Sequence, residues 1–383
     1  MIPRSLFSEE HDIFRESCRR FVEKEVTPHH RQWEKDGVVS REFWQTAGQA
    51  GMLCANIPEE YGGMGADFLF STIIMEEFAA AGATGPNVGL HSDIIAPYIQ
   101  HYGTEEQKRK WLPRAASGEC ILAIGMTEPG AGSDLQGMRT TAKRDGDEYV
   151  INGSKTFISN GQLADLVVLA CKTDPSEGWR GISLILVERE REGFERGRNL
   201  EKVGNHAQDT SELFFNDVRV PVSNLLGTEE GQGFIQLVSS LPQERLIQAI
   251  RSVSTIESAI QWTMDYTKER TAFGKPIIGF QNTQFKLAQM ESNCTMLRVF
   301  VDRCIELHMK GQLSEVDAAM AKMNATDMMV DALDEAVQFF GGNGYMWEYP
   351  IARAYADSRY TRVAGGTAEI MKQIIAKDMM KRN

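Results

Sequence analysis

The sequence predicts an α+β protein in which a helical region, a small β domain and a second helical region follow one another along the chain. Apolar residues recur at three- and four-residue intervals from Ser8 to about Gly118, which is the period of an α-helix. Short apolar runs between charged or Gly-rich turns replace this pattern from Cys120 onward. The helical period returns after Gly233. We therefore expect an N-terminal helical domain at 1–118, a central β domain at 119–230 and a C-terminal helical bundle domain at 231–383.

The N-terminal region begins with a recognisable helix start. Ser8 is followed by Glu9 and Glu10, and a capping hydroxyl with acidic residues in the first turn is typical of a helix N-terminus. Gly and Pro residues cluster at 57–65 and again at 82–86. These clusters divide the region into several helices.

The central region reads as a small antiparallel β domain. Strand-like runs lie at 121–126, 149–151, 155–159, 166–170, 182–187 and 213–215. Asn152-Gly153 separates two of them, and this dipeptide is a strong hairpin signal because both residues tolerate positive φ. We expect a hairpin turn at this point.

The sequence of the C-terminal region predicts long helices that form a bundle. Leu246, Ile250, Val253, Ile256 and Ile260 share one helical face, and little Pro interrupts the pattern. A nucleotide-binding domain of the Rossmann type would need strands alternating with helices and a G-x-G-x-x-G turn after a strand. Neither feature is present in this sequence, which argues against such a dehydrogenase.

Composition narrows the possible functions. The 383 residues are 42% apolar and 25% charged, as in an ordinary globular protein, and the net charge of -12 opposes binding to nucleic acid or anionic lipid. The six cysteines are scattered without C-x-x-C pairs, so we expect buried thiols and no metal site. No apolar run is long enough to span a membrane, and the first residues have no signal-peptide pattern. We expect a cytoplasmic or already processed protein.

Four segments have the composition of ligand-binding turns. They are Thr127–Asp134, Lys268–Lys275, Gln338–Tyr345 and Gly365–Thr367. Each also has an ordinary structural interpretation: a Pro-Gly turn after a strand, cations that complement a helix C-terminus, or a turn between helices. Taken one at a time, these segments do not decide between the two interpretations.

Together, in this order and at these separations, the segments resemble the acyl-CoA dehydrogenase family of FAD flavoproteins over essentially the whole chain. The motifs that carry the resemblance are Met126–Asp134, Asn152–Gly161, Arg270–Lys275 with Gln281, and Gln338–Gly344 followed by Glu348-Tyr-Pro350. The sequences around Glu244 and at Gly365-Gly-Thr are most similar to those of the long-chain branch. The resemblance implies the same three-domain arrangement that the periodicity predicts, with a four-helix bundle as the C-terminal domain.

The resemblance also implies which residues bind FAD. Some would contact the flavin, and others match positions that hold the cofactor of a neighbouring subunit, which implies a homo-oligomer and in this family usually a tetramer. Many members have Trp and Thr where this chain has Phe157 and Ser159, so an aromatic face and a hydroxyl are kept. The implied cofactor-binding residues are Met126, Thr127, Ser133, Phe157, Ser159, Arg270, Phe273, Gln281, Gln338, Gly341, Gly342, Thr367 and Glu369.

The catalytic base departs from the commonest family pattern. Most members carry the base as the Glu of a Glu-Gly-Thr sequence, and Gly365 occupies that position here. Either the chain is inactive as a dehydrogenase or the base comes from elsewhere. Glu244 resembles the base of the long-chain and isovaleryl-type branch, which reaches the same point from another helix. Without the family, Glu244 would be interpreted as a first-turn residue that complements a helix dipole after Pro242.

The implied reaction is α,β-dehydrogenation of a saturated acyl-CoA to a trans-2-enoyl-CoA, with electron-transfer flavoprotein as acceptor. We expect a medium-to-long straight acyl chain, with a short branched chain or an acyl-CoA oxidase as alternatives. The common oxidases carry a further C-terminal domain, which weighs against the oxidase. The implied substrate-binding residues are Ser133, Arg180, Pro242, Arg245, Gly365 and Gly366, the two glycines through their backbone N–H groups.

Overall fold

The computed structural model describes residues 2–382 and contains the three predicted regions in the predicted order. The N-terminal region is helical, and Ser8 caps its first helix as expected. Two π-helical segments, Val22–Val26 and Leu90–Ile95 (η3), interrupt it. Its α-helices are α1 (Glu9–Phe21), α2 (Thr27–Asp36), α3 (Arg41–Gln49), α4 (Phe68–Ala80), α5 (Ala96–Tyr102) and α6 (Glu105–Ala116).

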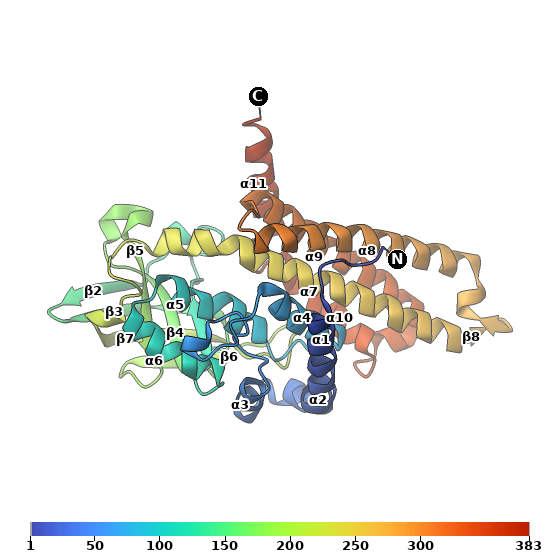
Figure 1. Ribbon diagram of the computed structural model, residues 1–383, viewed down its shortest axis with the longest axis horizontal. Helices are drawn as coiled ribbons and strands as arrows, with labels where there is room; N and C mark the ends of the chain where they lie inside the picture. Colours follow the sequence, from blue (N-terminus) through green and yellow to red (C-terminus); the bar gives the residue numbers. More distant parts are fainter. Residues whose placement is uncertain (1, 383) are drawn as a thin grey trace.

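The central region is one curled sheet, seen at the left of Figure 1. Strand β4 lies between β1 and β5, and the remaining strands continue from it in the order β2, β3, β7, β6. Most pairings are antiparallel, as expected, but β1 and β2 pair with β4 in parallel. The strands are β1 (Leu122–Gly125), β2 (Thr141–Asp145), β3 (Glu148–Ser159), β4 (Leu166–Lys172), β5 (Ile182–Glu188), β6 (Phe194–Asn199) and β7 (Thr210–Pro221).

Strands β1, β4 and β5 are buried on both faces. Leu166 and Val168 of β4 belong to the core that also contains helices of both helical regions, whereas Val167 and Leu169 face the interior of the β domain. A strand that is covered on both sides reads as a continuous apolar run. Burial on both faces explains why apolar and polar residues do not alternate along these strands. It also joins the β domain to the helices through one hydrophobic core.

The hairpin prediction at Asn152-Gly153 was wrong. Both residues lie inside the 12-residue strand β3, and the turn between β2 and β3 is instead at Gly146. Gly153 has φ +147° and sits at a bulge in the pairing of β3 with β7. The Asn152 side chain bonds to Asp217 of β7 through both its amide nitrogen and its oxygen. The permissive backbone of this dipeptide is used for a bulge, which the local sequence does not distinguish from a turn.

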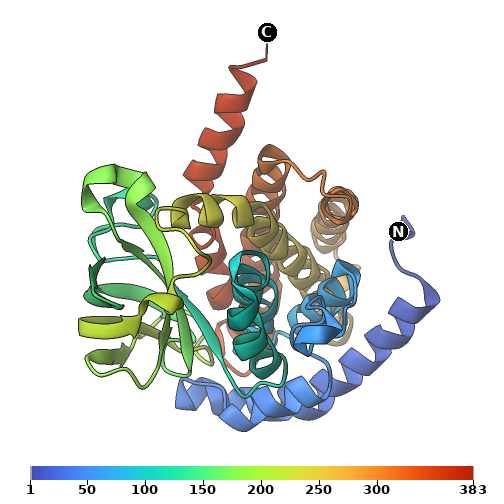
Figure 2. The same ribbon diagram turned by 60° about the vertical axis from the view of Figure 1, so that its left-hand side comes forward.

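The C-terminal region is a bundle whose long helices run across Figure 1, while Figure 2 shows the N-terminal helices curving around one side of it. Contacts at both ends show that α7 and α9 are parallel, with α8 between them in the chain: Arg245 pairs with Glu315, and the Tyr266 hydroxyl donates to the Phe340 carbonyl. Helix α11 leaves the bundle and points away from it (Figure 1). The helices are α7 (Gly233–Glu269), α8 (Gln281–Met309), α9 (Glu315–Phe340), α10 (Pro350–Ser358) and α11 (Ala368–Met379).

We predict that Gly153→Ala destabilises the β domain. A Cβ at this position would lie 2.5 Å from Thr140 Oγ1 and 2.7 Å from Thr140 Cα, and the positive φ adds strain. Relief requires backbone movement, so we expect a loss of ~1–3 kcal/mol. Gly279→Ala is the control, because its Cβ would meet only Lys275 Cδ at 3.5 Å. Chemical denaturation measures both variants, and equal midpoints would contradict the assignment of the bulge.

Candidate active site

Glu244 lies in α7 two residues after Pro242, and its side chain is buried, with 5% of the residue exposed. Tyr98 of α5 donates a hydrogen bond from its hydroxyl to Oε1 of Glu244, at 2.9 Å. Pro242 removes one backbone donor inside the helix and so marks a local irregularity next to this carboxyl. Because α7 begins at Gly233, Glu244 lies well inside the helix, and the interpretation of Glu244 as a first-turn residue was wrong.

A cavity opens beside Glu244. It contains about 710 Å³ of empty space, part of it open to solvent, and we call it the Glu244 cavity. Segments η3 and α5, helix α7 and the end of α8 form its walls. Burial lowers the pKa of His308 in this wall to about 4, so its ring is neutral near pH 7. The lining residues that matter for the chemistry are Ile94, Pro97, Tyr102, Pro242, His308 and Leu313.

Burial raises the pKa of Glu244 to about 7, although the Tyr98 hydrogen bond and the positive charge of Arg245 both favour the carboxylate. Surroundings that exclude water disfavour the charged form of a carboxyl, which explains the direction of this shift. A carboxyl with such a pKa accepts a proton readily and remains substantially ionised near pH 7. These are the properties of a general base.

The glycine loop, which we define as Gly365–Gly366, approaches the same part of α7. Both residues have positive φ, +68° and +96°. A Cβ built on Gly365 would meet only Gln248 Cγ, at 3.9 Å, and Gln248 is one helical turn after Glu244. Within residues 2–382, neither backbone N–H of the loop has a hydrogen-bond partner. The loop therefore combines open space with two free donors near the turn that carries Glu244.

A second group of predicted residues lies in the β domain, at the end of β1 and along β3. Phe157 is 68% exposed and has φ +59°, so an aromatic side chain is held out from the strand. Ser159 is half-buried, and Thr156 of the same strand donates its N–H to the Thr127 carbonyl at 2.9 Å. This bond joins β3 to the Met126–Thr127 segment.

The loop after β1 is open to a ligand. Ser133 is exposed, and a Cβ added to Gly130 or Gly132 would meet no atom within 4 Å. Lys155 holds the first residues of this loop, because its ammonium donates to the Met126 carbonyl at 3.0 Å and pairs with Glu128 at 2.8 Å. Backbone can therefore approach a ligand closely here while the segment beneath it stays ordered.

A third group lies at the opposite end of the bundle. Arg270 follows the last residue of α7, about 39 Å from Glu244 at the helical rise of about 1.5 Å per residue. Phe273 is 96% exposed at the tip of the β8–β9 hairpin (Thr271–Ala272 and Lys275–Pro276). The same end contains the start of α8 and the end of α9, and with them Gln281, Gln338, Gly341 and Gly342.

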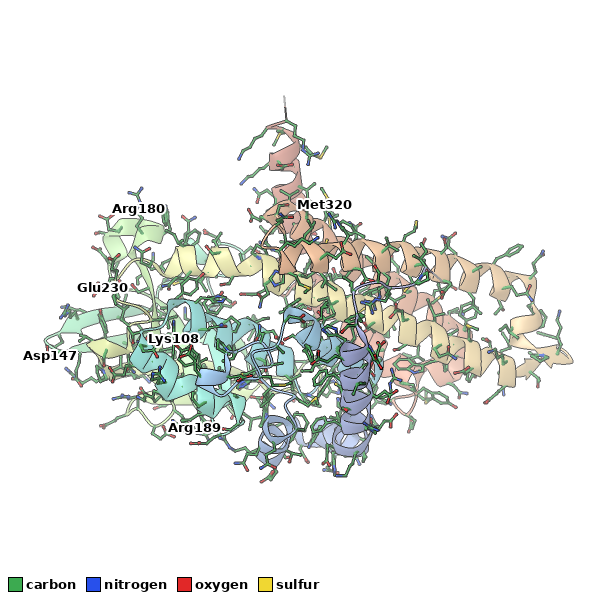
Figure 3. The ribbon with its side chains drawn as sticks, in the orientation of Figure 1. Lys108, Asp147, Arg180, Arg189, Glu230 and Met320 are labelled. Carbon is green, nitrogen blue, oxygen red and sulfur yellow. The ribbon has the colours of Figure 1, made fainter. Side chains whose placement is uncertain are left out.

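The remaining predicted residues are placed as follows. Thr367 caps α11 by accepting a hydrogen bond from the Ile370 N–H, and Glu369 is exposed in the first turn of that helix. Arg245 is buried and bonds to Glu315 at 3.3 Å. Arg180 is exposed in the β domain beside the first part of α7 (Figure 3), where the neighbouring Trp179 ring packs on Phe234. Its role in holding the CoA moiety stays a prediction.

Family models match the three regions of the chain. The N-terminal, middle and C-terminal domains of acyl-CoA dehydrogenase match residues 8–119, 123–218 and 231–380. The chain belongs to the acyl-CoA dehydrogenase family. A pig protein, "Long-chain specific acyl-CoA dehydrogenase, mitochondrial", is 51% identical over 98% of this chain and 88% of its own.

Solved structures of acyl-CoA dehydrogenases and related flavoproteins have the same fold. The acyl-CoA dehydrogenase from Geobacillus kaustophilus is 52% identical, with a TM-score of 0.96 over 98% of this chain and all of its own. A chain from a structure titled for the electron transferring flavoprotein of Acidaminococcus fermentans is 35% identical, with a TM-score of 0.94 over 98% and 99% of the two chains.

The cofactor of this family is FAD, and the residues present fit it. An exposed aromatic ring at Phe157, the open loop at Gly130 and Gly132, and the free N–H groups of the glycine loop are suited to a planar ring and its polar edge. The exposed Phe273 and Arg270 at the far end suit another aromatic and a phosphate group. Their distance from Glu244 means that both groups cannot line one site within one chain.

Sequence reasoning missed three residues of this site: Tyr98, Gln248 and Lys322. The Lys322 side chain is fully buried in α9 and donates to the Gly366 carbonyl at 2.7 Å. No local pattern marks these residues, because each meets the site only through helix packing. Over residues 2–382 the structure contains no cluster of metal-ligating side chains, no disulfide and no helix apolar and long enough to cross a bilayer.

We predict that Glu244→Gln stabilises the protein more at alkaline than at acidic pH. The folded state binds this proton more tightly than the unfolded chain, because its pKa is about 7 rather than 4.5. Stability therefore falls as pH rises from about 4.5 to 7, by ~3 kcal/mol at most, and stays lower above that range. Glutamine keeps the Tyr98 hydrogen bond and does not titrate.

The measurement is the melting temperature of both proteins at pH 5 and pH 8. The difference in favour of Glu244→Gln should be larger at pH 8. Glu229→Gln, an exposed acid just before α7, is the control and should show no such trend. A constant difference between wild type and Glu244→Gln would mean that this carboxyl keeps its ordinary pKa in the folded protein.

Proposed function

We propose that this acyl-CoA dehydrogenase oxidises a saturated acyl-CoA to the trans-2-enoyl-CoA, with Glu244 as the base that removes the α-proton. The observation that carries this proposal is the buried carboxyl of Glu244 at the wall of a cavity, beside a glycine loop with free N–H donors. The position that holds the base in most of the family is Gly365, which has no side chain to offer. Glu244 therefore supplies the carboxylate.

The α-proton of a thioester is too weakly acidic for a carboxylate unless the enolate oxygen is stabilised. The N–H groups of Gly365 and Gly366 are suited to donate hydrogen bonds to that oxygen, because they have no partner in the described chain. Tyr98 orients Glu244 by its hydrogen bond, and the surrounding helices exclude water from it. Bound FAD supplies the acceptor for the β-hydride.

Other residues would hold the substrate and the cofactor. Met126, Thr127, Phe157 and Ser159 line the region suited to the flavin ring, with Thr367 and Glu369 at the start of α11. Ser133 and Arg245 remain candidates for the CoA moiety. Arg180 is a further candidate for the CoA moiety, because it is exposed beside the first part of the helix that carries Glu244 (Figure 3).

The acyl group that we propose is a long straight chain. The Glu244 cavity opens beside the carboxyl, and burial lowers the pKa of both of its histidines, His101 and His308, which disfavours a charge in the wall along which an apolar chain would lie. The pig protein that is 51% identical over nearly the whole chain is named long-chain specific. A short branched chain is the alternative, since a potato protein named isovaleryl-CoA dehydrogenase is 34% identical.

We further propose a homotetramer that passes electrons to an electron-transfer flavoprotein in fatty-acid β-oxidation. Support for an oligomer comes from the exposed Phe273 and Arg270, which lie too far from Glu244 to serve the same cofactor in one chain. The structural similarity to a chain solved in a study of electron transferring flavoprotein supports the acceptor. The expected cytoplasmic location stays a prediction.

We predict that Glu244→Gln retains bound flavin but loses reduction of the flavin by substrate. The amide fills the same volume and accepts from Tyr98, yet it cannot take a proton. Anaerobic mixing with palmitoyl-CoA should bleach the visible flavin band of wild type and of Glu229→Gln and leave that of Glu244→Gln unchanged. Bleaching of Glu244→Gln at the wild-type rate would remove Glu244 from the mechanism.

The chain-length proposal predicts a higher kcat/KM for palmitoyl-CoA than for butyryl-CoA or isovaleryl-CoA. Each additional buried methylene contributes up to about 0.8 kcal/mol of binding free energy, so the preference should rise with length until the cavity is filled. Steady-state rates with a series of straight and branched acyl-CoAs measure it. Fastest turnover of isovaleryl-CoA would favour the branched-chain alternative.

A further inference from the structure

Lys322 is a buried cation that the proposed mechanism does not yet use. Its side chain has no exposed area, and its ammonium donates to the carbonyl oxygen of Gly366 at 2.7 Å. Within the described chain, no carboxylate oxygen lies within 4 Å of this ammonium. A buried, unpaired charge is costly to a fold, so its presence beside the glycine loop calls for a functional reason.

The charged groups around Lys322 come from four elements. Asp327 on α9 is paired with Arg362 at 2.6 Å, and Glu369 is on α11. Arg245 on α7 repels Lys322 and is the residue that follows Glu244. Burial is the main cause that lowers the pKa of Lys322 to about 8, which still leaves it mostly charged at neutral pH. Lys322 therefore adds positive charge at the glycine loop.

The glycine loop needs an anchor. Two successive glycines with positive φ have wide conformational freedom, and a Cβ built on Gly365 would meet nothing closer than Gln248 Cγ at 3.9 Å. Lys322 provides a side-chain hydrogen bond to this loop from the rigid helix α9. The bond fixes the peptide plane that follows Gly366 and so restrains one end of the glycine loop, which limits how far its free N–H groups can turn.

We propose that Lys322 is a positioning residue that holds the N–H donors of the glycine loop in place and, through its charge, favours the thioester enolate. The inference rests on the proposed function. In the step concerned, the α-C–H bond breaks, the proton passes to Glu244, and the electron pair moves onto the thioester oxygen. Negative charge on that oxygen is stabilised by the loop donors and by the nearby ammonium in a site of low dielectric.

The principal variant is Lys322→Met, which keeps the length of the side chain and removes its charge and its hydrogen bond. Removal of an unpaired buried charge is neutral or stabilising for a fold, so the melting temperature and the flavin content should be retained. The rate of flavin reduction by palmitoyl-CoA should fall about a hundredfold, the usual effect of losing a donor at an oxyanion site. Lys35→Met, an exposed lysine on α2, is the control.

A second measurement isolates proton removal from oxidation. A 3-thia-acyl-CoA has sulfur in place of the β-carbon, so it can lose its α-proton but has no β-hydride to transfer. Its enolate beside oxidised flavin should give a long-wavelength charge-transfer absorption that grows with pH. In Lys322→Met the pH midpoint of this absorption should rise by about one unit or more relative to wild type, whereas Lys35→Met should leave it unchanged.

Lys322→Arg tests charge separately from geometry and provides a second variant if Lys322→Met does not fold. Arginine keeps the positive charge, so it should retain more enolate formation than methionine does. Wild-type reduction rates and an unchanged enolate midpoint in folded Lys322→Met would overturn the proposal. A wild-type protein that palmitoyl-CoA does not bleach would instead overturn the proposed function, so the two failures are distinguishable.

Discussion

Helix α7 is the element on which the rest of the site depends. Its 37 residues carry Glu244 near one end and lead directly to Arg270 at the other, and it packs on α4, α8 and α9. A helix of this length, packed on several sides, holds its two ends at a fixed separation. The proposed base and the proposed cofactor-binding residues Arg270 and Phe273 therefore lie too far apart to line one site in one chain, which supports the proposed oligomer.

The active site concentrates charge where a fold would ordinarily avoid it. Glu244 has one hydroxyl partner, and Lys322 has one carbonyl partner. Burial penalises the charged form of each group, and this lowers the stability of the fold while making both groups sensitive to small changes in their surroundings. In the proposed proton transfer the two groups have complementary roles. The carboxyl of Glu244 accepts the proton, and the ammonium of Lys322 stabilises the negative charge that develops on the substrate. These two positions therefore lower the free energy of unfolding while serving the proposed proton transfer.

In the β domain, local sequence patterns predicted the strands correctly but placed a hairpin turn wrongly. The apolar runs at β1, β4 and β5 predicted strands because burial on both faces requires such runs. Asn152-Gly153 indicated a permissive backbone, which Gly153 does have, but the strand continues through it. Whether positive φ closes a turn or forms a bulge depends on the neighbouring strand, here through Asp217 of β7. That neighbour lies 65 residues away in the chain.

The sequence by itself determined the order of the three regions, the helical and strand segments, the family, and the residue types that carry the chemistry, because periodicity and motifs are local properties. It also pointed to Glu244 once Gly365 left the usual position without a side chain. Only the tertiary structure decided that Glu244 is buried beside a cavity, that Tyr98 donates a hydrogen bond to Glu244, and that Lys322 donates one to the glycine loop. These relations join residues far apart in the chain, and their distances follow from how helices pack, which no local pattern encodes.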